Sequence, residues 1–156
     1  MKFRVNAGVV GSTGYTGIEL IRLLNFHKKV EIKYLISRSN YGKKISDYYP
    51  GLNFKNYPKL VKFSQVNWNE IDIIFLCLPS GESKKIIVKI PNNISVIDLS
   101  NDFRLNSLTT GKWIYGLADH LGDFIDYKKN EKFKINISNP GCYATSVLSP
   151  LIPLLK

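Results

Sequence analysis

The sequence contains few cysteines and no long apolar run. Only two cysteines, Cys77 and Cys142, occur among its 156 residues, and they lie far apart. This spacing is unlike a disulfide framework and predicts a protein of a reducing compartment, the cytoplasm. No apolar run reaches the roughly 18 residues of a membrane-spanning helix, and the first residues lack the apolar core of a secretory signal. We therefore expect a cytoplasmic protein with no membrane partner.

A long basic run is also absent, although the formal net charge is +10. The lysines are spread in doublets, at 28–29, 43–44, 84–85 and 128–129, and no aromatic residues alternate with them in an RNA-binding pattern. This dispersed charge does not favour nucleic-acid binding. It suits a solvated surface and a few contacts to a small anionic ligand.

Segments typical of strands and helices alternate along the chain. Apolar, β-branched segments predict strands, and apolar residues at helical spacing predict the helices between them. We expect strands at 4–10, 30–36, 71–78, 94–99 and 135–138, with helices around 18–24, around 86–88 and from 143 onward. Residues 38–58 are expected to form mainly a loop, and residues 101–131 to be irregular. The alternation predicts an α/β fold with a Rossmann-like, doubly wound, mainly parallel sheet.

The C-terminal stretch is apolar and has no helix-stop signal. Residues 146–155 combine apolar side chains with two prolines, Pro150 and Pro153. Such a surface is expected to need a partner. We therefore expect residues 1–145 to form a cofactor-binding domain, and residues 146–156 to begin a second, α+β catalytic domain that is missing from this sequence.

A glycine-rich turn follows the first predicted strand. Glycine recurs at every third position from Gly8 to Gly17, although the spacing differs from the usual G-x-G-x-x-G. Glycine permits a tight turn and a close approach to a pyrophosphate, and the following helix would offer unpaired N–H groups to it. The alternative is a tight turn that binds no ligand. We predict that cofactor is bound by Gly11, Ser12, Thr13, Gly14, Tyr15, Thr16 and Gly17.

The end of the second predicted strand distinguishes between the two nicotinamide dinucleotides. An acidic residue there would bind the ribose of NAD, but this sequence has Ser37-Arg38-Ser39, with Lys43 and Lys44 nearby. Guanidinium and hydroxyl groups suit a 2′-phosphate. Although a solvated turn is the alternative, we predict NADP, bound partly by Ser37, Arg38 and Ser39.

The two cysteines differ in their settings. Cys142 follows Asn139-Pro140-Gly141 at the predicted start of a helix, where N–H groups favour a thiolate, the nucleophilic form. Cys77 lies within an apolar strand and is expected to serve only in packing. From these residues alone, Cys142 is either a nucleophile or a small buried side chain.

Four motifs resemble those of the N-acetyl-gamma-glutamyl-phosphate reductases of arginine biosynthesis, along nearly the whole chain. They are Gly11-Ser12-Thr13-Gly14-Tyr15-Thr16-Gly17, Leu78-Pro79-Ser80-Gly81-Glu82-Ser83, Asp98-Leu99-Ser100-Asn101-Asp102-Phe103-Arg104-Leu105 and Asn139-Pro140-Gly141-Cys142-Tyr143. The resemblance implies that Cys142 displaces phosphate from N-acetyl-glutamyl phosphate, forming a thioester that NADPH reduces to the semialdehyde. The chain departs from the family's Tyr-Gly-Leu-Pro-Glu at Ala118-Asp119, which leaves the role of Asp119 open.

The resemblance also suggests roles for other residues. The segment Leu78, Pro79, Ser80 and Gly81 ends a central strand, where open α/β sheets bind ligands, and is assigned to the cofactor. Arg104 would hold the phosphate or carboxylate of the substrate, or else form a salt bridge with Asp98 or Asp102. Asn139 would orient the acyl oxygen, or else cap the following helix. No metal site is expected.

The family's acid/base histidine comes from a later catalytic domain. Of the two histidines here, His27 is expected on the surface at a helix end and His120 in a solvated loop. We therefore expect this chain alone to be inactive, and the full-length protein to be a homo-oligomer. Two alternatives stay open, namely a relative acting on aminoadipyl or aspartyl phosphate and a non-catalytic NADP-binding module.

Overall fold

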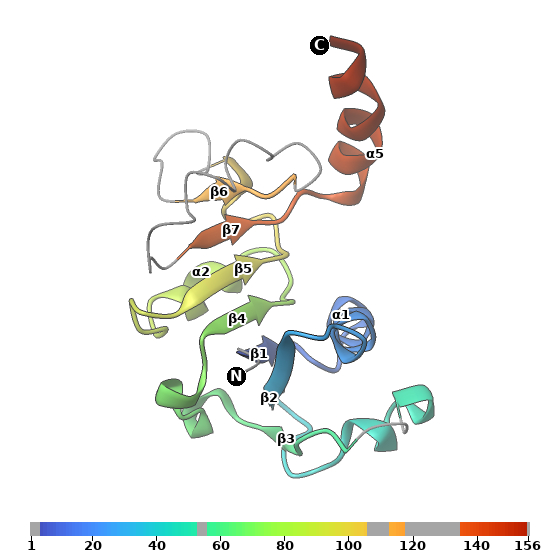
Figure 1. The fold of residues 1–156 in the computed structure, drawn as a ribbon. Helices are drawn as coiled ribbons and strands as arrows, with labels where there is room; N and C mark the ends of the chain where they lie inside the picture. Colours follow the sequence, from blue (N-terminus) through green and yellow to red (C-terminus); the bar gives the residue numbers. More distant parts are fainter. Residues whose placement is uncertain (1–3, 53–55, 106–112, 118–134, 156) are drawn as a thin grey trace. The chain divides into compact units, whose positions relative to one another are not determined.

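The computed structural model describes residues 4–52, 56–105, 113–117 and 135–155. It divides into two compact units, Met1–Leu78 and Pro79–Lys156. Each unit is built from parallel strands (Figure 1).

The first unit is a four-stranded parallel sheet with the strand order β3-β2-β1-β4. Strand β4 is a run of four apolar residues, whereas β2 alternates apolar residues with Glu31 and Lys33. Ala7, Val9 and Ile74 are completely buried, so they form the centre of this core. The strands are β1 (Val5–Val10), β2 (Val30–Ile36), β3 (Leu60–Val61) and β4 (Ile73–Leu76).

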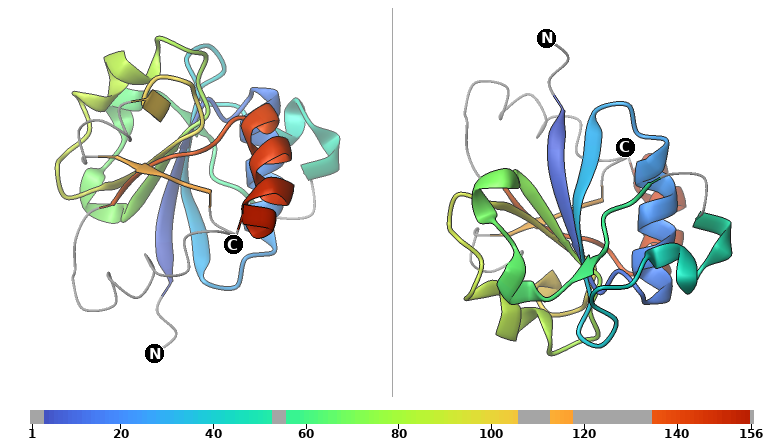
Figure 2. Two further views of the ribbon diagram at one scale, coloured as in Figure 1. Left: turned by 90° about the horizontal axis from the view of Figure 1, so that it is seen from above. Right: turned by 90° about the horizontal axis from the view of Figure 1, so that it is seen from below.

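Helix α1 (Tyr15–Asn25) connects β1 to β2 and packs beside both strands (Figures 1 and 2). Gly17, Ile21 and Leu24 form its buried face. These positions are spaced by three or four residues, which is the periodicity that places side chains on one face of a helix. Glu19 and Arg22 pair on the exposed face.

The region between β2 and β4 is mainly irregular, as predicted for residues 38–58. Ile45 and Leu52 are buried and anchor two short 3₁₀ helices within it, Ile45–Asp47 and Pro50–Leu52. Strand β3 was not predicted, and neither were the 3₁₀ helices Phe63–Gln65 and Trp68–Glu70.

The second unit contains a three-stranded parallel arrangement in the order β5-β7-β6. The rings of Phe103 and Trp113 stack with centroids 4.0 Å apart, and both residues are buried. The elements are α2 (Ser83–Ile87), β5 (Ser95–Asp98), β6 (Ile114–Tyr115), β7 (Asn136–Ser138), α5 (Cys142–Leu151) and a terminal 3₁₀ helix, Ile152–Leu155.

Helix α5 projects beyond the end of β7 and has no buried residue (Figure 1). Its apolar side chains are therefore exposed or half-buried. The helix continues unbroken through residues 145 and 146, where we placed a domain boundary, and that boundary stays a prediction.

All five strands predicted from the sequence are present, with ends that differ by at most two residues. Strand β6 was missed inside the segment expected to be irregular. Cys77 lies one residue after β4, and not within it as predicted, and it is half-buried. Within the described ranges, no helix is long and apolar enough to cross a membrane.

Candidate functional site

The glycine-rich turn lies between β1 and α1 and allows no side chain at two of its positions. Gly11 has a φ of +77°, a conformation that favours glycine, and a Cβ atom there would overlap the carbonyl oxygen of Cys77. A Cβ atom on Gly17 would overlap the carbonyl oxygen of Gly11. The backbone is therefore packed against backbone, in the compact form that lets a ligand's phosphates approach the main chain closely.

Hydrogen bonds to the neighbouring strand hold this turn. The N–H groups of Gly11 and Ser12 donate to the carbonyl of Ile36, at 3.0 and 3.3 Å. The fully buried Ser12 hydroxyl also donates to that carbonyl, at 3.1 Å. The N–H and the hydroxyl of Ser12 are therefore both used to hold the turn against β2.

The N-terminus of α1 has no side-chain cap. Gly14 is the N-cap residue, and the first helical hydrogen bond runs from the N–H of Ile18 to its carbonyl, at 2.9 Å. The N–H groups of Tyr15, Thr16 and Gly17 precede that bond and have no partner within a helix. Such a helix start attracts anions.

The predicted 2′-phosphate residues follow β2, next to this turn. The hydroxyls of Ser37 and Thr13 are 3.4 Å apart, so the structure brings the two predicted cofactor segments together. Ser37 is buried, whereas Arg38 and Ser39 are exposed. The Tyr49 hydroxyl donates to the Thr13 carbonyl at 3.1 Å, which ties the loop after β2 to the glycine turn.

In the second unit, the loop at Pro79–Gly81 is held by one carboxylate. The Oδ1 atom of Asp102 accepts from the N–H of Gly81 at 2.6 Å, and its Oδ2 atom accepts from the N–H of Lys84 at 3.0 Å. Gly81 has a φ of +87°, while Pro79 and Ser80 are exposed. The Asp98–Leu105 motif thus organises the other motif assigned to the cofactor.

Asp98 stabilises the turn before Asp102 through hydrogen bonds. It is completely buried, and its Oδ2 atom accepts from the Ser100 hydroxyl at 2.7 Å. The Ser100 hydroxyl in turn accepts from the N–H of Asp102, at 3.0 Å. This chain of hydrogen bonds fixes the turn that presents both Asp102 and Arg104.

Cys142 is exposed and is the first residue of α5. Gly141 is the N-cap residue, no side chain caps the helix, and the N–H of Thr145 donates to the Gly141 carbonyl at 2.9 Å. The N–H groups of Cys142, Tyr143 and Ala144 therefore lie before the first helical bond. The interpretation of Cys142 as a small buried side chain is therefore wrong, because the residue is exposed.

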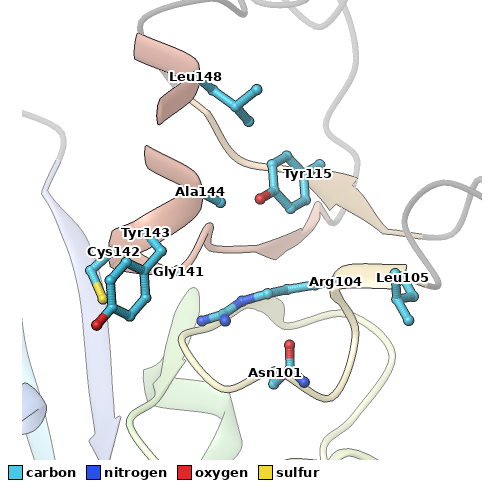
Figure 3. Close-up of a pocket in the computed structure, with 9 residues that line it drawn as sticks. All are labelled: Asn101, Arg104, Leu105, Tyr115, Gly141, Cys142, Tyr143, Ala144 and Leu148. Carbon is cyan, nitrogen blue, oxygen red and sulfur yellow. The ribbon is translucent and has the colours of Figure 1, made fainter. Parts of the chain in front are cut away.

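Arg104 extends toward the start of α5 (Figure 3). Its Nε atom donates to the carbonyl of Asn139 at 2.9 Å, and its Nη2 atom donates to the carbonyl of Leu99 at 3.1 Å. A Cβ atom on Gly141 would lie 2.8 Å from its Nη1 atom. Arg104 thus links the end of β5 to the loop that carries Cys142.

These groups line a pocket of about 720 Å³, large enough for a small metabolite. In Figure 3, Tyr115 points from β6 toward α5, while Asn101 lies below the Arg104 guanidinium. The lining residues are Asn101, Arg104, Leu105, Tyr115, Gly141, Cys142, Tyr143, Ala144 and Leu148.

The remaining expectations for single residues have different outcomes. The capping role considered for Asn139 is wrong, because Gly141 is the N-cap residue and the Asn139 side-chain amide donates to the Pro140 carbonyl. His27 is exposed just beyond the end of α1, as predicted. Asp119 and His120 lie outside the described residues. Among the described residues, no His, Cys, Asp and Glu cluster could hold a metal ion.

Of the nine residues that line the pocket, the sequence predicted a site role only for Cys142 and Arg104, and Asn101, Tyr115 and Leu148 are among those it missed. Asn101 lies within a motif that had been singled out, and Tyr115 begins the Tyr-Gly-Leu segment already compared with the family pattern. Gly116 could have been a signal, since a Cβ atom there would overlap the Ile137 side chain on β7. Leu148 belongs to a uniformly apolar stretch, which contains no signal for a site.

Comparison with known proteins identifies the family. The family described as "Semialdehyde dehydrogenase, NAD binding domain" matches residues 6–126. The chain belongs to this family. It is 42% identical over its whole length to an N-acetyl-gamma-glutamyl-phosphate reductase of Ehrlichia ruminantium, covering 48% of that protein. It is also 42% identical, over 97% of its length, to the reductase of the same name from Thermoanaerobacter pseudethanolicus, covering 47% of that protein.

Solved structures confirm the Rossmann-like fold class. A Candida albicans aspartate semialdehyde dehydrogenase solved with NADP has a TM-score of 0.70 at 22% identity, over 97% of this chain and 47% of that one. Aspartate semialdehyde dehydrogenase II from Vibrio cholerae has a TM-score of 0.69 at 19% identity, over 97% and 46%. The predicted resemblance to the reductase family is confirmed, and the chain spans about half the length of the curated relatives it matches.

Proposed function

We propose that this chain carries the cofactor site and the nucleophile of an NADPH-dependent reductase that converts N-acetyl-L-glutamyl 5-phosphate to the 5-semialdehyde. The observation that supports it most directly is the placement of Cys142, exposed at an uncapped helix start and lining one pocket with Arg104. The reductases named above share 42% identity with the whole chain. Cytoplasmic location and homo-oligomer formation of the full-length protein belong to the same proposal.

The glycine turn fits a dinucleotide. Its backbone leaves no room for a Cβ atom at Gly11 or Gly17, and the N–H groups at the start of α1 would hold the pyrophosphate. Ser37, Arg38 and Ser39 would hold the 2′-phosphate of NADP. The family description supports a nicotinamide cofactor, and the Candida albicans protein was solved with NADP. The Leu78–Gly81 segment would contribute further cofactor contacts.

Cys142 would carry out the acyl transfer. Its thiolate Sγ atom attacks the acyl carbon of the substrate, a C–S bond forms, and the C–O bond to phosphate breaks as inorganic phosphate leaves with the electron pair. When bound, the nicotinamide supplies the hydride that takes the thioester to the aldehyde level. Expulsion of the Cys142 thiolate then completes the turnover.

Arg104 would hold the departing phosphate or the substrate carboxylate. Its guanidinium already contacts the Cys142 loop, so an anion bound to it would lie in the same pocket as the thiol. Guanidinium donors match phosphate and carboxylate oxygens. Asn139 would help to orient the acyl oxygen.

A chimera would test this function. The remaining half of the Ehrlichia ruminantium reductase, joined after Lys156, should allow phosphate-dependent reduction of NADP⁺ with N-acetyl-L-glutamate 5-semialdehyde. Cys142→Ser should lower kcat at least about thousandfold, because the nucleophile is lost. Cys77→Ser is the matched control and should keep most of the activity.

Two results would count against the proposal, and a third would overturn the expected inactivity of the chain alone. Undiminished turnover by Cys142→Ser would remove the nucleophile assignment. A higher kcat/KM for the aspartate or aminoadipate semialdehyde would favour the corresponding relative. Comparable turnover by the 156-residue chain alone would show that these residues suffice, and His120 would then be the first acid/base candidate to replace.

A further inference from the structure

A lysine after β3 lies beside the predicted 2′-phosphate residues. Strands β2 and β3 pair in parallel, with Leu35 opposite Leu60 and Ile36 opposite Val61. The N–H of Ser37 continues this ladder by donating to the Val61 carbonyl at 3.0 Å. The next step of the register therefore places Lys62 opposite Ser37, about 5 Å away across the sheet.

The ammonium group of Lys62 is directed over the segment that follows Arg38. Its Nζ atom lies 4.0 Å from the centroid of the Tyr41 ring, within the range of a cation–π interaction. Lys62 itself is exposed, so its ammonium remains accessible to a ligand. Lys62 therefore places a positive charge against the loop that follows β2 and contains Arg38.

The backbone on both sides of this contact is well fixed. The N–H of Gly42 donates to the Leu60 carbonyl at 2.6 Å, and the N–H of Leu60 donates to the Lys43 carbonyl at 2.9 Å. The N–H of Lys62 itself donates to the Gln65 side chain at 2.8 Å. The loop after β2 and the segment after β3 are thus joined by main-chain bonds, which keep Tyr41 and Lys62 together.

We propose that Lys62 is a second cationic contact for the 2′-phosphate of NADP and that the Tyr41 ring positions its ammonium group. This inference rests on the proposed NADP site. A phosphomonoester carries about −1.5 to −2 charges at pH 7, more than the single guanidinium of Arg38 balances. Lys62 supplies a compact second charge, which the sequence alone did not indicate because β3 was not predicted.

Binding of 2′,5′-ADP and 5′-AMP to the 156-residue chain isolates the contribution of the 2′-phosphate. Lys62→Gln should weaken 2′,5′-ADP binding about tenfold, as loss of a charge-assisted contact does, and should change 5′-AMP binding by less than about twofold. Lys29→Gln is the matched control, because it removes the same charge at the opposite, amino end of β2. Isothermal titration calorimetry at low salt measures all of these affinities.

Two further variants test the role of the ring. Tyr41→Phe keeps the aromatic face and should bind 2′,5′-ADP like the unmodified chain, whereas Tyr41→Leu should reproduce part of the Lys62→Gln loss. Lys62→Arg should retain most of the affinity.

The outcomes separate this inference from the NADP assignment. If Arg38→Ala weakens 2′,5′-ADP binding but Lys62→Gln matches Lys29→Gln, then Lys62 has no part in the site and the inference is wrong. If the unmodified chain binds 2′,5′-ADP no better than 5′-AMP, both the NADP assignment and this inference fall.

Discussion

Two strand-to-helix turns carry the chemistry proposed for this chain, and their backbones are nearly alike. The N-cap residue of α1, Gly14, has φ −82° and ψ 161°, and that of α5, Gly141, has φ −73° and ψ 160°. Neither helix has a side-chain cap. The neighbours differ, however, because Gly11 and Gly17 in the first turn pack against backbone, whereas Gly141 packs against the Arg104 guanidinium.

The two helices differ in burial as well. Helix α1 buries one face on the sheet, while α5 buries no residue and exposes large apolar side chains such as Tyr143, at 86%, and Val147, at 53%. The phosphate-binding turn is thus supported by a packed core. The cysteine turn relies on one long side chain, which can move more easily than backbone can.

The largest contrast is expected between the helix faces. Ile21→Ala should lower the free energy of unfolding by about 2–5 kcal/mol, because it opens a cavity at a completely buried position. Val147→Ala, at a residue 53% exposed on α5, should change it by less than about 0.5 kcal/mol. Urea unfolding followed by circular dichroism measures both. Equal losses would show that α5 packs as firmly as α1.

A glycine series should separate backbone strain from steric overlap. Gly42→Ala introduces only the strain of a φ of +84°, since nothing lies within 4 Å, and should cost about 1–2 kcal/mol of unfolding free energy. Gly11→Ala adds overlap with the Cys77 carbonyl and should cost at least about 1 kcal/mol more. Gly51→Ala, with open space and no positive φ, is the control. A Gly11→Ala cost no greater than that of Gly42→Ala would mean that the turn relaxes freely.

The smallest effect is expected at Gly141. Gly141→Ala should lower the free energy of unfolding by at most about 1 kcal/mol, because its neighbour is the end of a flexible side chain. A double-mutant cycle with Arg104→Ala tests the cause. The Gly141→Ala cost should vanish in that background, since the contacted group is gone. A cost that persists unchanged would place the strain in the backbone.

Much of the first unit could be predicted from the sequence because its signals are local. The apolar runs around Val9 and Ile74 predicted strands, and the apolar spacing around Ile21 and Leu24 predicted the helix that forms α1. Glycine at position 11 predicted a turn that only glycine fits, and the structure confirms this. In the second unit, the motif around Cys142 likewise predicted that the cysteine starts a helix, and α5 begins at that residue.

Strands β3 and β6 could not be predicted in this way. Each contains only two residues, too few for an alternating pattern, and each is stabilised by pairing with a neighbour distant in the sequence. Lys62 and Tyr115 lie in or next to these strands, so their places near the two sites followed only from the tertiary structure.

The sequence by itself determined which residue types are available for binding and catalysis, and the order of strands and helices that carry them. Only the tertiary structure decided how the segments support one another, as with Asp102 holding the Gly81 loop and Arg104 holding the Asn139 carbonyl. The reason is physical, because hydrogen-bond partners 21 and 35 residues apart are selected by chain packing and leave no periodic trace in the sequence.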